Sequence, residues 1–502
     1  MRTNWNIRFY GLLLTVASIT GRIACQDLKS DLTGAGLTAL FPGDSGYQDA
    51  SKAYNLRFNV SPAAVVYPES AQQVAAAIQA GASTHTQVVA RSGGHSYIAN
   101  GVGGKNGALV IDLSKLKNIT VDNNAGTAVI QTGNRLGDVA QALNDQGRAL
   151  PHGTCPYVGV GGHASFGGFG FASRMWGLTI DHIISAEVVL ANGTIVTASN
   201  TTNSDLFWAM RGAGSSFGIT TAFTFATEPV PSSALVFSYS WNAVNATALA
   251  HIISAYQSFV QTDIPATFDA ELTLGKGGSS NTASVEFVGG WYGKPADLNS
   301  TVKPFLDQIP QKPTVSITGG TWLESLESLA GSDTLSTSAP DETDTFYAKS
   351  LMTPENSPMS AAAINAFASY LTHQGYTSNT NWFTQIELYG GPNSAINAVP
   401  LDATSFASRS TLFTIQFYAS SSNYSPPYPN VGFSFLDAMV ASIVDNSPSD
   451  WAYGAYTNYI EDKLNNSQAL YYGSHYERLQ SIKKEVDPNN VFNFLTSIAE
   501  PQ

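Results

Sequence analysis

The pattern of hydrophobic and polar positions changes period repeatedly along the chain, which predicts an α+β protein with mixed runs of strand and helix. Residues 67–82 read as a strand end followed by a helix, with Ser70 and Gln73 forming a capping-box pattern at its start. Residues 183–199 alternate around Asn192–Gly193, which predicts a β-hairpin. Short apolar runs predict further strands at 88–90, 108–113, 128–131 and 217–225.

Residues 153–177 break this pattern because they are crowded with glycine and show no periodicity. Such a stretch can present backbone N–H groups to a pyrophosphate without a helix dipole. Gly159, Gly161 and Ala164 match the dinucleotide fingerprint G-x-G-x-x-A, but Cys155 and Pro156 stand where that fingerprint needs a strand. The sequence therefore argues against a Rossmann fold.

The second half of the chain begins where Pro229 and Pro231 interrupt the pattern. A chain of 502 residues favours more than one domain, so we place a boundary there. The following half alternates helices with strands at 271–274, 283–287, 383–388 and 411–418.

Composition narrows the class of protein. Apolar residues make up 43% of the chain and charged residues only 12%, which is enough apolar material for a large core. The net charge is −13 and no basic run occurs, so we expect neither nucleic acid nor an anionic membrane as a partner.

The N-terminus is typical of a secreted protein. Arg2 and Arg8 precede an apolar stretch at 12–19, and small residues lead to Ala24, so we predict a signal peptide over residues 1–24. The stretch is too short for a stable membrane-spanning helix. Secretion also agrees with N-glycosylation sequons at Asn59, Asn118, Asn192, Asn200, Asn245, Asn299, Asn423 and Asn465.

The chain has two cysteines, Cys25 and Cys155, and Cys25 lies at the predicted cleavage site. A single cysteine left in an oxidising compartment needs an explanation. Cys155 is buried and inert, paired with Cys25, or used chemically. Two cysteines are too few for a cysteine-rich metal site, and we predict no metal.

Two segments carry the strongest chemical signal. R-S-G-G-H-S-Y at 91–97 places two glycines before His95, which lets the backbone approach a ligand closely and holds the imidazole against it. H-G-T-C-P at 152–156 leads into the glycine-rich stretch. Both segments therefore indicate a ligand site.

These motifs, with D-L-F-W-A-M-R-G at 205–212 and the run at 471–492, resemble in their order the flavoproteins of the vanillyl-alcohol oxidase superfamily, and within it the berberine bridge enzyme and glucooligosaccharide oxidase branch. The resemblance implies a PCMH-type FAD-binding domain of two subdomains over 55–230. It implies a substrate domain over 231–450, an antiparallel sheet backed by helices. The C-terminal segment 451–502 would return to the FAD domain and complete the active site.

The resemblance also implies a bicovalent FAD. His95 matches the histidine bonded to the flavin 8α-methyl carbon, and Cys155 matches the cysteine bonded at flavin C6. Two bonds would hold the ring rigidly and raise its reduction potential. Other cofactor contacts are expected from Arg91, Ser92, Gly93, Gly94, Ser96, Gly159, Gly161, Gly162, Tyr456 and Asn458.

Val158 matches the position that gates oxygen in this family, and its small size implies dioxygen as the electron acceptor and hydrogen peroxide as a product. Y-T-N-Y at 456–459 resembles the family segment that carries the general base, here Tyr459. Q-I-E at 385–387 matches a Q-x-D segment, so Glu387 replaces an aspartate beside the tyrosine. Gln385, Gln416, Tyr418 and Tyr97 are expected to line the same cleft.

Two departures bear on the substrate. Phe383 stands where the carbohydrate oxidases of the family have tryptophan, and E-L-T at 271–273 stands where they have an arginine and a glutamate. We therefore prefer a small hydroxyl-bearing, amine or phenol-type substrate from fungal secondary metabolism. An oligosaccharide oxidase that forms a lactone is the first alternative, and an inactive secreted binding protein is the second. We expect a monomer.

Overall fold

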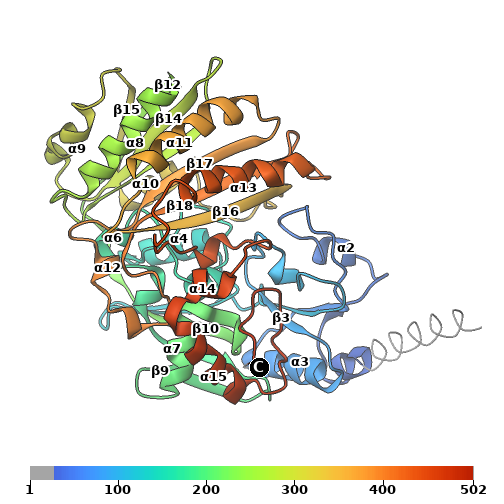
Figure 1. Cartoon of the computed structure of the whole chain (residues 1–502). Coiled ribbons are helices and arrows are strands. Elements are labelled where there is room, and N and C mark those ends of the chain that lie inside the picture. The colour runs from blue at the N-terminus through green and yellow to red at the C-terminus, as the bar shows by residue number, and fades with distance from the viewer. Residues whose placement is uncertain (1–27, 501–502) are drawn as a thin grey trace, which may run out of the picture.

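The computed structural model describes residues 28–500 of the chain (Figure 1). The predicted signal peptide over 1–24 and Cys25 lie outside these residues. None of the helices in the described part is long and apolar enough to cross a membrane.

The N-terminal region contains a small mixed sheet in the order β1-β2-β4-β3, in which β2, β4 and β3 are parallel. Its strands are β1 (Ala39–Leu40), β2 (Ala64–Val66), β3 (Val88–Arg91) and β4 (Leu109–Asp112). Helix α3 (Ala71–Ser83) packs on it through a shared apolar core. Ser70 caps this helix by accepting a bond from the Gln73 amide, whereas the Gln73 side chain accepts from Glu69 rather than from Ser70.

A second, five-stranded antiparallel sheet has the order β5-β6-β10-β8-β9. Its strands are β5 (Ile119–Asp122), β6 (Thr127–Gln131), β8 (Ile183–Val189), β9 (Ile195–Ser199) and β10 (Ile219–Ala226). The predicted hairpin is confirmed, with Gly193 in the left-handed region at φ 82°. Helices α4 (Leu136–Asn144) and α7 (Ser204–Ala213) contribute to the core of this region.

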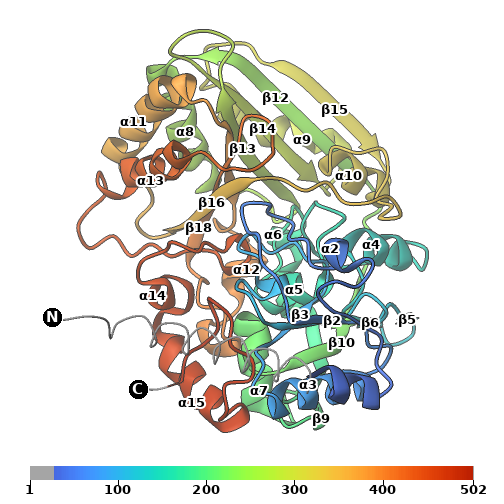
Figure 2. The ribbon, with the colours of Figure 1, turned by 90° about the vertical axis from the view of Figure 1, so that its right-hand side faces the viewer.

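The third sheet is antiparallel and seven-stranded, in the order β15-β12-β14-β13-β17-β18-β16. Its strands are β12 (Ala234–Val244), β13 (Phe268–Lys276), β14 (Ala283–Trp291), β15 (Thr314–Gly320), β16 (Phe346–Pro354), β17 (Asn381–Leu388) and β18 (Thr411–Ser420). Helices cover one face of it (Figure 2), namely α8 (Ala246–Val260), α9 (Leu298–Leu306), α11 (Ala361–Tyr370) and α13 (Asn430–Val444). Because side chains alternate along a strand, the opposite face is free to carry polar groups toward the N-terminal region.

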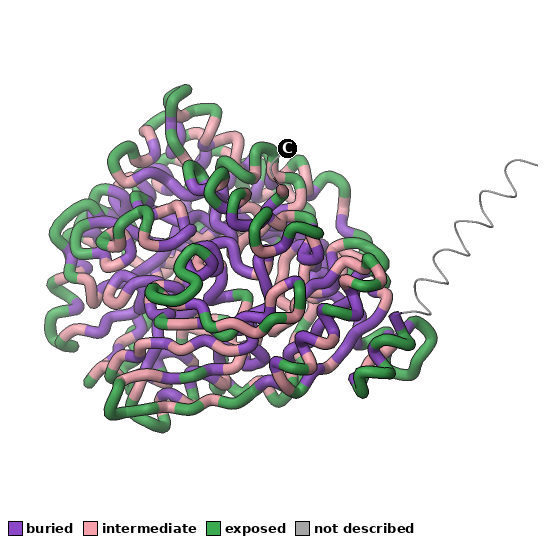
Figure 3. The backbone as a smooth tube through the Cα atoms, turned by 90° about the horizontal axis from the view of Figure 1, so that it is seen from below, coloured by how far each residue is buried: buried purple, intermediate pink, exposed green. Residues whose placement is uncertain are grey.

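Short elements complete the chain: α2 (Tyr47–Ala50), β7 (Arg148–Ala149), α5 (Val160–Ser165), α6 (Ser173–Trp176), β11 (Glu228–Pro229), α10 (Trp322–Leu329), α12 (Ala395–Ala398), α14 (Ser467–Tyr472) and α15 (Tyr476–Val486). The C-terminal helices lie against the N-terminal half in both ribbon views, and α15 contacts α7. Lys483 of α15 is fully buried and donates to the Ser216 carbonyl at 2.8 Å, which ties the C-terminal segment to the N-terminal half. Exposed positions gather at the outer turns, around a buried interior (Figure 3).

The glycine-rich stretch differs from expectation. The sequence of residues 153–177 shows no helical periodicity, yet the stretch contains α5 and α6. Helix α5 has no apolar periodicity, and its backbone passes close to another segment: a Cβ atom on Gly161 would lie 3.0 Å from Ser92 Oγ. Tertiary contact, not amphipathic pattern, sets the local conformation.

Candidate active site

A cavity of about 670 Å³ lies between the glycine-rich motifs and the polar face of the seven-stranded sheet. Its size is that of a site for a cofactor or small molecule. The loop after β3, residues 153–171, the strands β13, β14, β17 and β18, and the segment 456–460 all contribute to its wall. Segments far apart in the sequence therefore meet at one site.

Two glycines bring the two sequence motifs together. A Cβ atom on Gly93 would lie 2.3 Å from the Gly159 nitrogen, and one on Gly159 would lie 2.0 Å from the Gly93 nitrogen. Only glycine permits this backbone approach. The Gly161 amide also donates to Ser92 Oγ at 3.1 Å. His95 and Cys155 consequently face the same cavity.

The residues predicted from the sequence to be catalytic or to bind the cofactor all lie on the cavity wall. They are Arg91, Ser92, Gly93, Gly94, His95, Ser96, Cys155, Val158, Gly159, Gly161, Gly162, Gln385, Glu387, Gln416, Tyr456, Asn458 and Tyr459. Arg91 is not free to bind a ligand through its whole guanidinium, because it pairs with Asp112 and donates to the Ala50 carbonyl. It holds the loop that carries His95.

His95 has two close partners that the sequence did not indicate. Its Nε2 lies 2.6 Å from Asp341 Oδ2, and its ring stacks on Tyr54 with the centroids 4.0 Å apart. Cys155 is a free thiol exposed to the cavity. The surrounding protein raises the pKa of this thiol by desolvation, so the thiol is protonated at neutral pH.

Tyr459 and Glu387 form the central polar pair of the site. The tyrosine hydroxyl donates to Glu387 Oε1 at 2.6 Å. Glu387 is 5% exposed, and Oε2 has no hydrogen-bond partner among residues 28–500. Burial, and then the charge of Glu271, raise the pKa of Glu387 well above its usual range. Burial, and then the charge of Glu387, raise the pKa of Tyr459.

A row of polar side chains crosses the sheet beside this pair. Glu286, Thr273, Gln385 and Gln416 are direct cross-strand neighbours in that order, and all four line the cavity. Gln385 Nε2 donates to Glu271 Oε1 at 2.6 Å.

Aromatic rings border this polar row. Gln416 Nε2 donates to the Tyr97 hydroxyl at 2.7 Å, and the Tyr97 ring lies parallel to that of Tyr459 with the centroids 6.1 Å apart. The expectation that Tyr418 lines the cleft is wrong, because its hydroxyl bonds Asp344 and its ring stacks on Phe383 outside the cavity wall. Phe383 thus lies beside the cavity rather than on its wall.

Hydrogen bonds fix the segment that carries Tyr459 on the N-terminal side of this tyrosine. The hydroxyl of Tyr456 accepts from the Gly168 and Phe169 amides at 3.0 and 3.1 Å. Asn458 Nδ2 donates to the His163 carbonyl at 3.1 Å. Tyr456 and Asn458 therefore tie the segment to the glycine-rich stretch.

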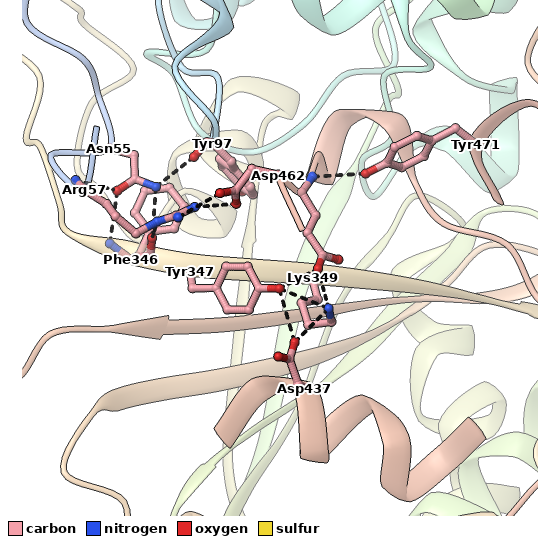
Figure 4. Close-up of polar contacts among 10 residues, drawn as sticks. Asn55, Arg57, Tyr97, Phe346, Tyr347, Lys349, Asp437, Asp462 and Tyr471 are labelled. Carbon is pink, nitrogen blue, oxygen red and sulfur yellow. Dashed lines mark hydrogen bonds and ion pairs between the residues drawn. The ribbon is translucent and has the colours of Figure 1, made fainter. Parts of the chain in front are cut away.

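The same segment is held after the tyrosine by two ion pairs (Figure 4). Asp462 accepts two bonds from Arg57, at 2.6 and 2.9 Å, and both side chains are mostly buried. Glu461 pairs with Lys349 of β16. Anchors on both sides limit the motion of the tyrosine, which is what a positioned catalytic group needs.

Comparisons with known proteins agree with this site. Residues 62–199 match the family described as FAD binding domain, and residues 455–499 match that described as berberine and berberine like. The glucooligosaccharide oxidase of Sarocladium strictum is 38% identical over 464 residues, which cover 90% of each chain.

Solved structures show the same fold. The carbohydrate oxidase from Microdochium nivale, in complex with a substrate analogue, has a TM-score of 0.89 and 32% identity, covering 95% of this chain and 100% of that one. The glucooligosaccharide oxidase from Acremonium strictum, described with a 6-S-cysteinyl, 8α-N1-histidyl FAD, has a TM-score of 0.87 and 35% identity, covering 95% and 99%. The α+β fold expected from the sequence is confirmed.

Proposed function

We propose a function on the premise that the chain belongs to the family of FAD-linked oxidases with a berberine-like C-terminal segment. The protein is an FAD-dependent oxidoreductase. The family and the FAD cofactor predicted from the sequence are therefore confirmed, and an enzyme is favoured over an inactive binding protein. The attachment of the flavin, the roles of single residues and the substrate are our proposals.

The residues at the cavity fit a flavin bonded at two points, through His95 and Cys155. Both side chains face one cavity, and the thiol is free. His95 Nδ1 makes no hydrogen bond to any residue of the described range, so this nitrogen is available for a bond. A Cβ atom at Gly162 would meet nothing within 4 Å, which leaves room for a ligand against the backbone.

When bound, FAD supplies a ring that accepts hydride from the substrate and passes the electrons to dioxygen. Tyr459 takes the proton of a substrate hydroxyl, and Glu387 accepts the hydrogen bond of Tyr459 and so draws its proton away. Val158 lies on the cavity wall, and we propose that its small side chain admits dioxygen.

We infer that the substrate hydroxyl belongs to the reducing end of an oligosaccharide, which leaves as a lactone. This proposal rests on the row of polar side chains beside the Tyr459–Glu387 pair, namely Glu286, Thr273, Gln385 and Gln416. A sugar presents several hydroxyl groups, and each needs a hydrogen-bonding partner once it leaves water. The preference for a secondary metabolite rested on Phe383 and on residues 271–273. Phe383 lies off the cavity wall, and Glu271 and Thr273 still supply polar groups to it.

The test is peroxide release from purified protein with cello-, xylo- and chito-oligosaccharides and, in parallel, with aromatic alcohols and phenols. We expect oxidation of at least one oligosaccharide series, and a Gln385→Leu variant with higher KM for it. Oxidation of the aromatic compounds alone would instead establish the secondary-metabolite alternative.

We also propose that the protein is secreted as an N-glycosylated monomer. All eight sequon asparagines are exposed, as glycosylation requires. Treatment of the protein from a eukaryotic host with peptide N-glycosidase should lower its mass, and light scattering should report the mass of one chain. An unchanged mass after treatment would contradict the first part, and the mass of a dimer would contradict the second.

A further inference from the structure

The connection between α10 and β16 crosses from the seven-stranded sheet to the cofactor side of the cavity. Leu335 is buried against α4, and its carbonyl lies where a Cβ atom on Gly137 would stand. Thr337 Oγ1 donates to Asp138 Oδ1 at 2.8 Å. At the far end, Asp344 accepts from the Tyr418 hydroxyl at 2.8 Å. Both ends of the stretch that carries Asp341 are therefore fixed.

From this connection Asp341 reaches the imidazole that we assign to flavin attachment. Its Oδ2 lies 2.6 Å from His95 Nε2, and the Tyr54 ring stacks on the imidazole and limits its rotation. An ionised carboxylate can only accept, so Nε2 must carry the proton of the neutral ring. The lone pair of the neutral imidazole is then on Nδ1, which has no hydrogen-bond partner within residues 28–500.

We propose that Asp341 is a positioning residue for covalent attachment of the flavin, acting through His95; this inference rests on the attachment proposed above. Asp341 keeps the proton on Nε2 and thereby presents Nδ1 to the flavin methyl carbon. It also stabilises the positive charge that the ring acquires when Nδ1 forms a bond while Nε2 still holds its proton.

The attachment balances with dioxygen as the oxidant, the acceptor already required by the proposed oxidase activity. A bond forms between Nδ1 and the 8α carbon. One C–H bond of the methyl group and the N–H bond of Nε2 are broken. The two protons and two electrons released are taken up by dioxygen, which becomes hydrogen peroxide. Asp341 lies at the nitrogen that loses its proton, which is where a carboxylate assists this step.

The experiment compares acid-stable flavin in holoprotein variants, with a Cys155→Ala background that leaves His95 as the single attachment point. Cys155→Ala should keep its flavin after acid precipitation, whereas Asp341→Ala in that background should release most of it. Loss of one charge-assisted hydrogen bond corresponds to roughly tenfold slower bond formation or more. Glu342→Ala is the matched control, because this neighbouring carboxylate is exposed and makes no hydrogen bond within the described residues, so it should change nothing.

A second readout separates positioning from a structural role of the connection. In the single Asp341→Ala variant, peptide mass mapping should find flavin on Cys155 but little on His95, with the yellow colour of the native protein kept. Asp341→Asn, which preserves the shape of the side chain, is measured in the same way in case the alanine variant does not fold. Complete His95 attachment in the Asp341 variants would overturn the inference. If acid precipitation released all flavin from the Cys155→Ala variant, flavin would not be bonded to His95, and the proposed role of Asp341 would be excluded as well.

Discussion

Replacing Glu387 with glutamine removes a buried carboxyl group that can take up a proton and keeps the shape of the side chain. Glu387 Oε1 accepts a hydrogen bond from the Tyr459 hydroxyl at 2.6 Å, and Oε2 has no hydrogen-bond partner in the described part of the chain. The amide of Glu387→Gln can still accept that bond, but it cannot take up the proton. The substitution therefore tests whether proton acceptance at this position drives the reaction.

We expect a large loss of rate without a loss of stability. A positioned general base contributes about 100- to 10,000-fold, which corresponds to about 3–5 kcal/mol of activation free energy. The carboxylate has no cationic partner among residues 28–500, so its replacement by a neutral group should leave the free energy of unfolding equal or higher. Peroxide release measures the first effect, and thermal unfolding measures the second.

The raised pKa of Glu387 predicts how activity and stability each change with pH. Because burial raises the pKa of Glu387, the fraction able to accept a proton grows as pH rises through that pKa, and wild-type activity should rise with it. The folded protein holds this proton more tightly than the unfolded chain does, so the contribution of Glu387 to stability is lost as pH rises from about 4.3 through the raised pKa. Both trends should disappear in Glu387→Gln. A variant with near wild-type rate and an unchanged pH profile would refute the role of Glu387.

Three further substitutions test other parts of the site. Tyr459→Phe keeps the ring stacked beside Tyr97 and should retain full flavin but lose about 100-fold or more in kcat; an undiminished rate would exclude this tyrosine as the base. Asp462→Ala removes the bidentate pair with Arg57 and should cost about 1.5–3 kcal/mol in urea unfolding and lower kcat. The exposed pair partner Asp307 is the control, since Asp307→Ala should change stability by about 0.5 kcal/mol or less, and equal effects would refute the anchor. Val158→Leu adds one methylene to a packed wall and should slow reoxidation of the reduced flavin by dioxygen about tenfold in stopped-flow measurements. The variant should still reduce an artificial dye that accepts electrons in place of dioxygen. Unchanged reoxidation by dioxygen would show that Val158 is not the oxygen gate.

The parts of the site that could be predicted from the sequence are those carried by contiguous motifs. His95 and Cys155 stand beside glycines whose lack of a side chain is required where the two backbones meet. The alternation of β17 also predicts that Gln385 and Glu387 share a face, since residues two apart in a strand point the same way. Local sequence therefore indicated these groups.

Other contacts depend on the path of the chain in three dimensions. Asp341 lies in a connection without periodicity, and nothing near it in the sequence marks its contact with His95. The pairing of Arg57 with Asp462 joins the two ends of the chain, so neither residue predicts the other. Helix α5 escaped prediction because its glycines carry no apolar pattern. In each case tertiary contacts, rather than local propensity, determine the arrangement.

The central claim, a flavin bonded at both motifs, is tested most directly by peptide mapping of the holoprotein. After proteolysis that separates residues 91–97 from residues 153–163, mass spectrometry should find one species in which a single FAD joins the peptide of His95 to that of Cys155. Its ultraviolet–visible spectrum should be that of a flavin, and acid precipitation should release none. Two unmodified peptides, together with free FAD in the acid supernatant, would contradict the account.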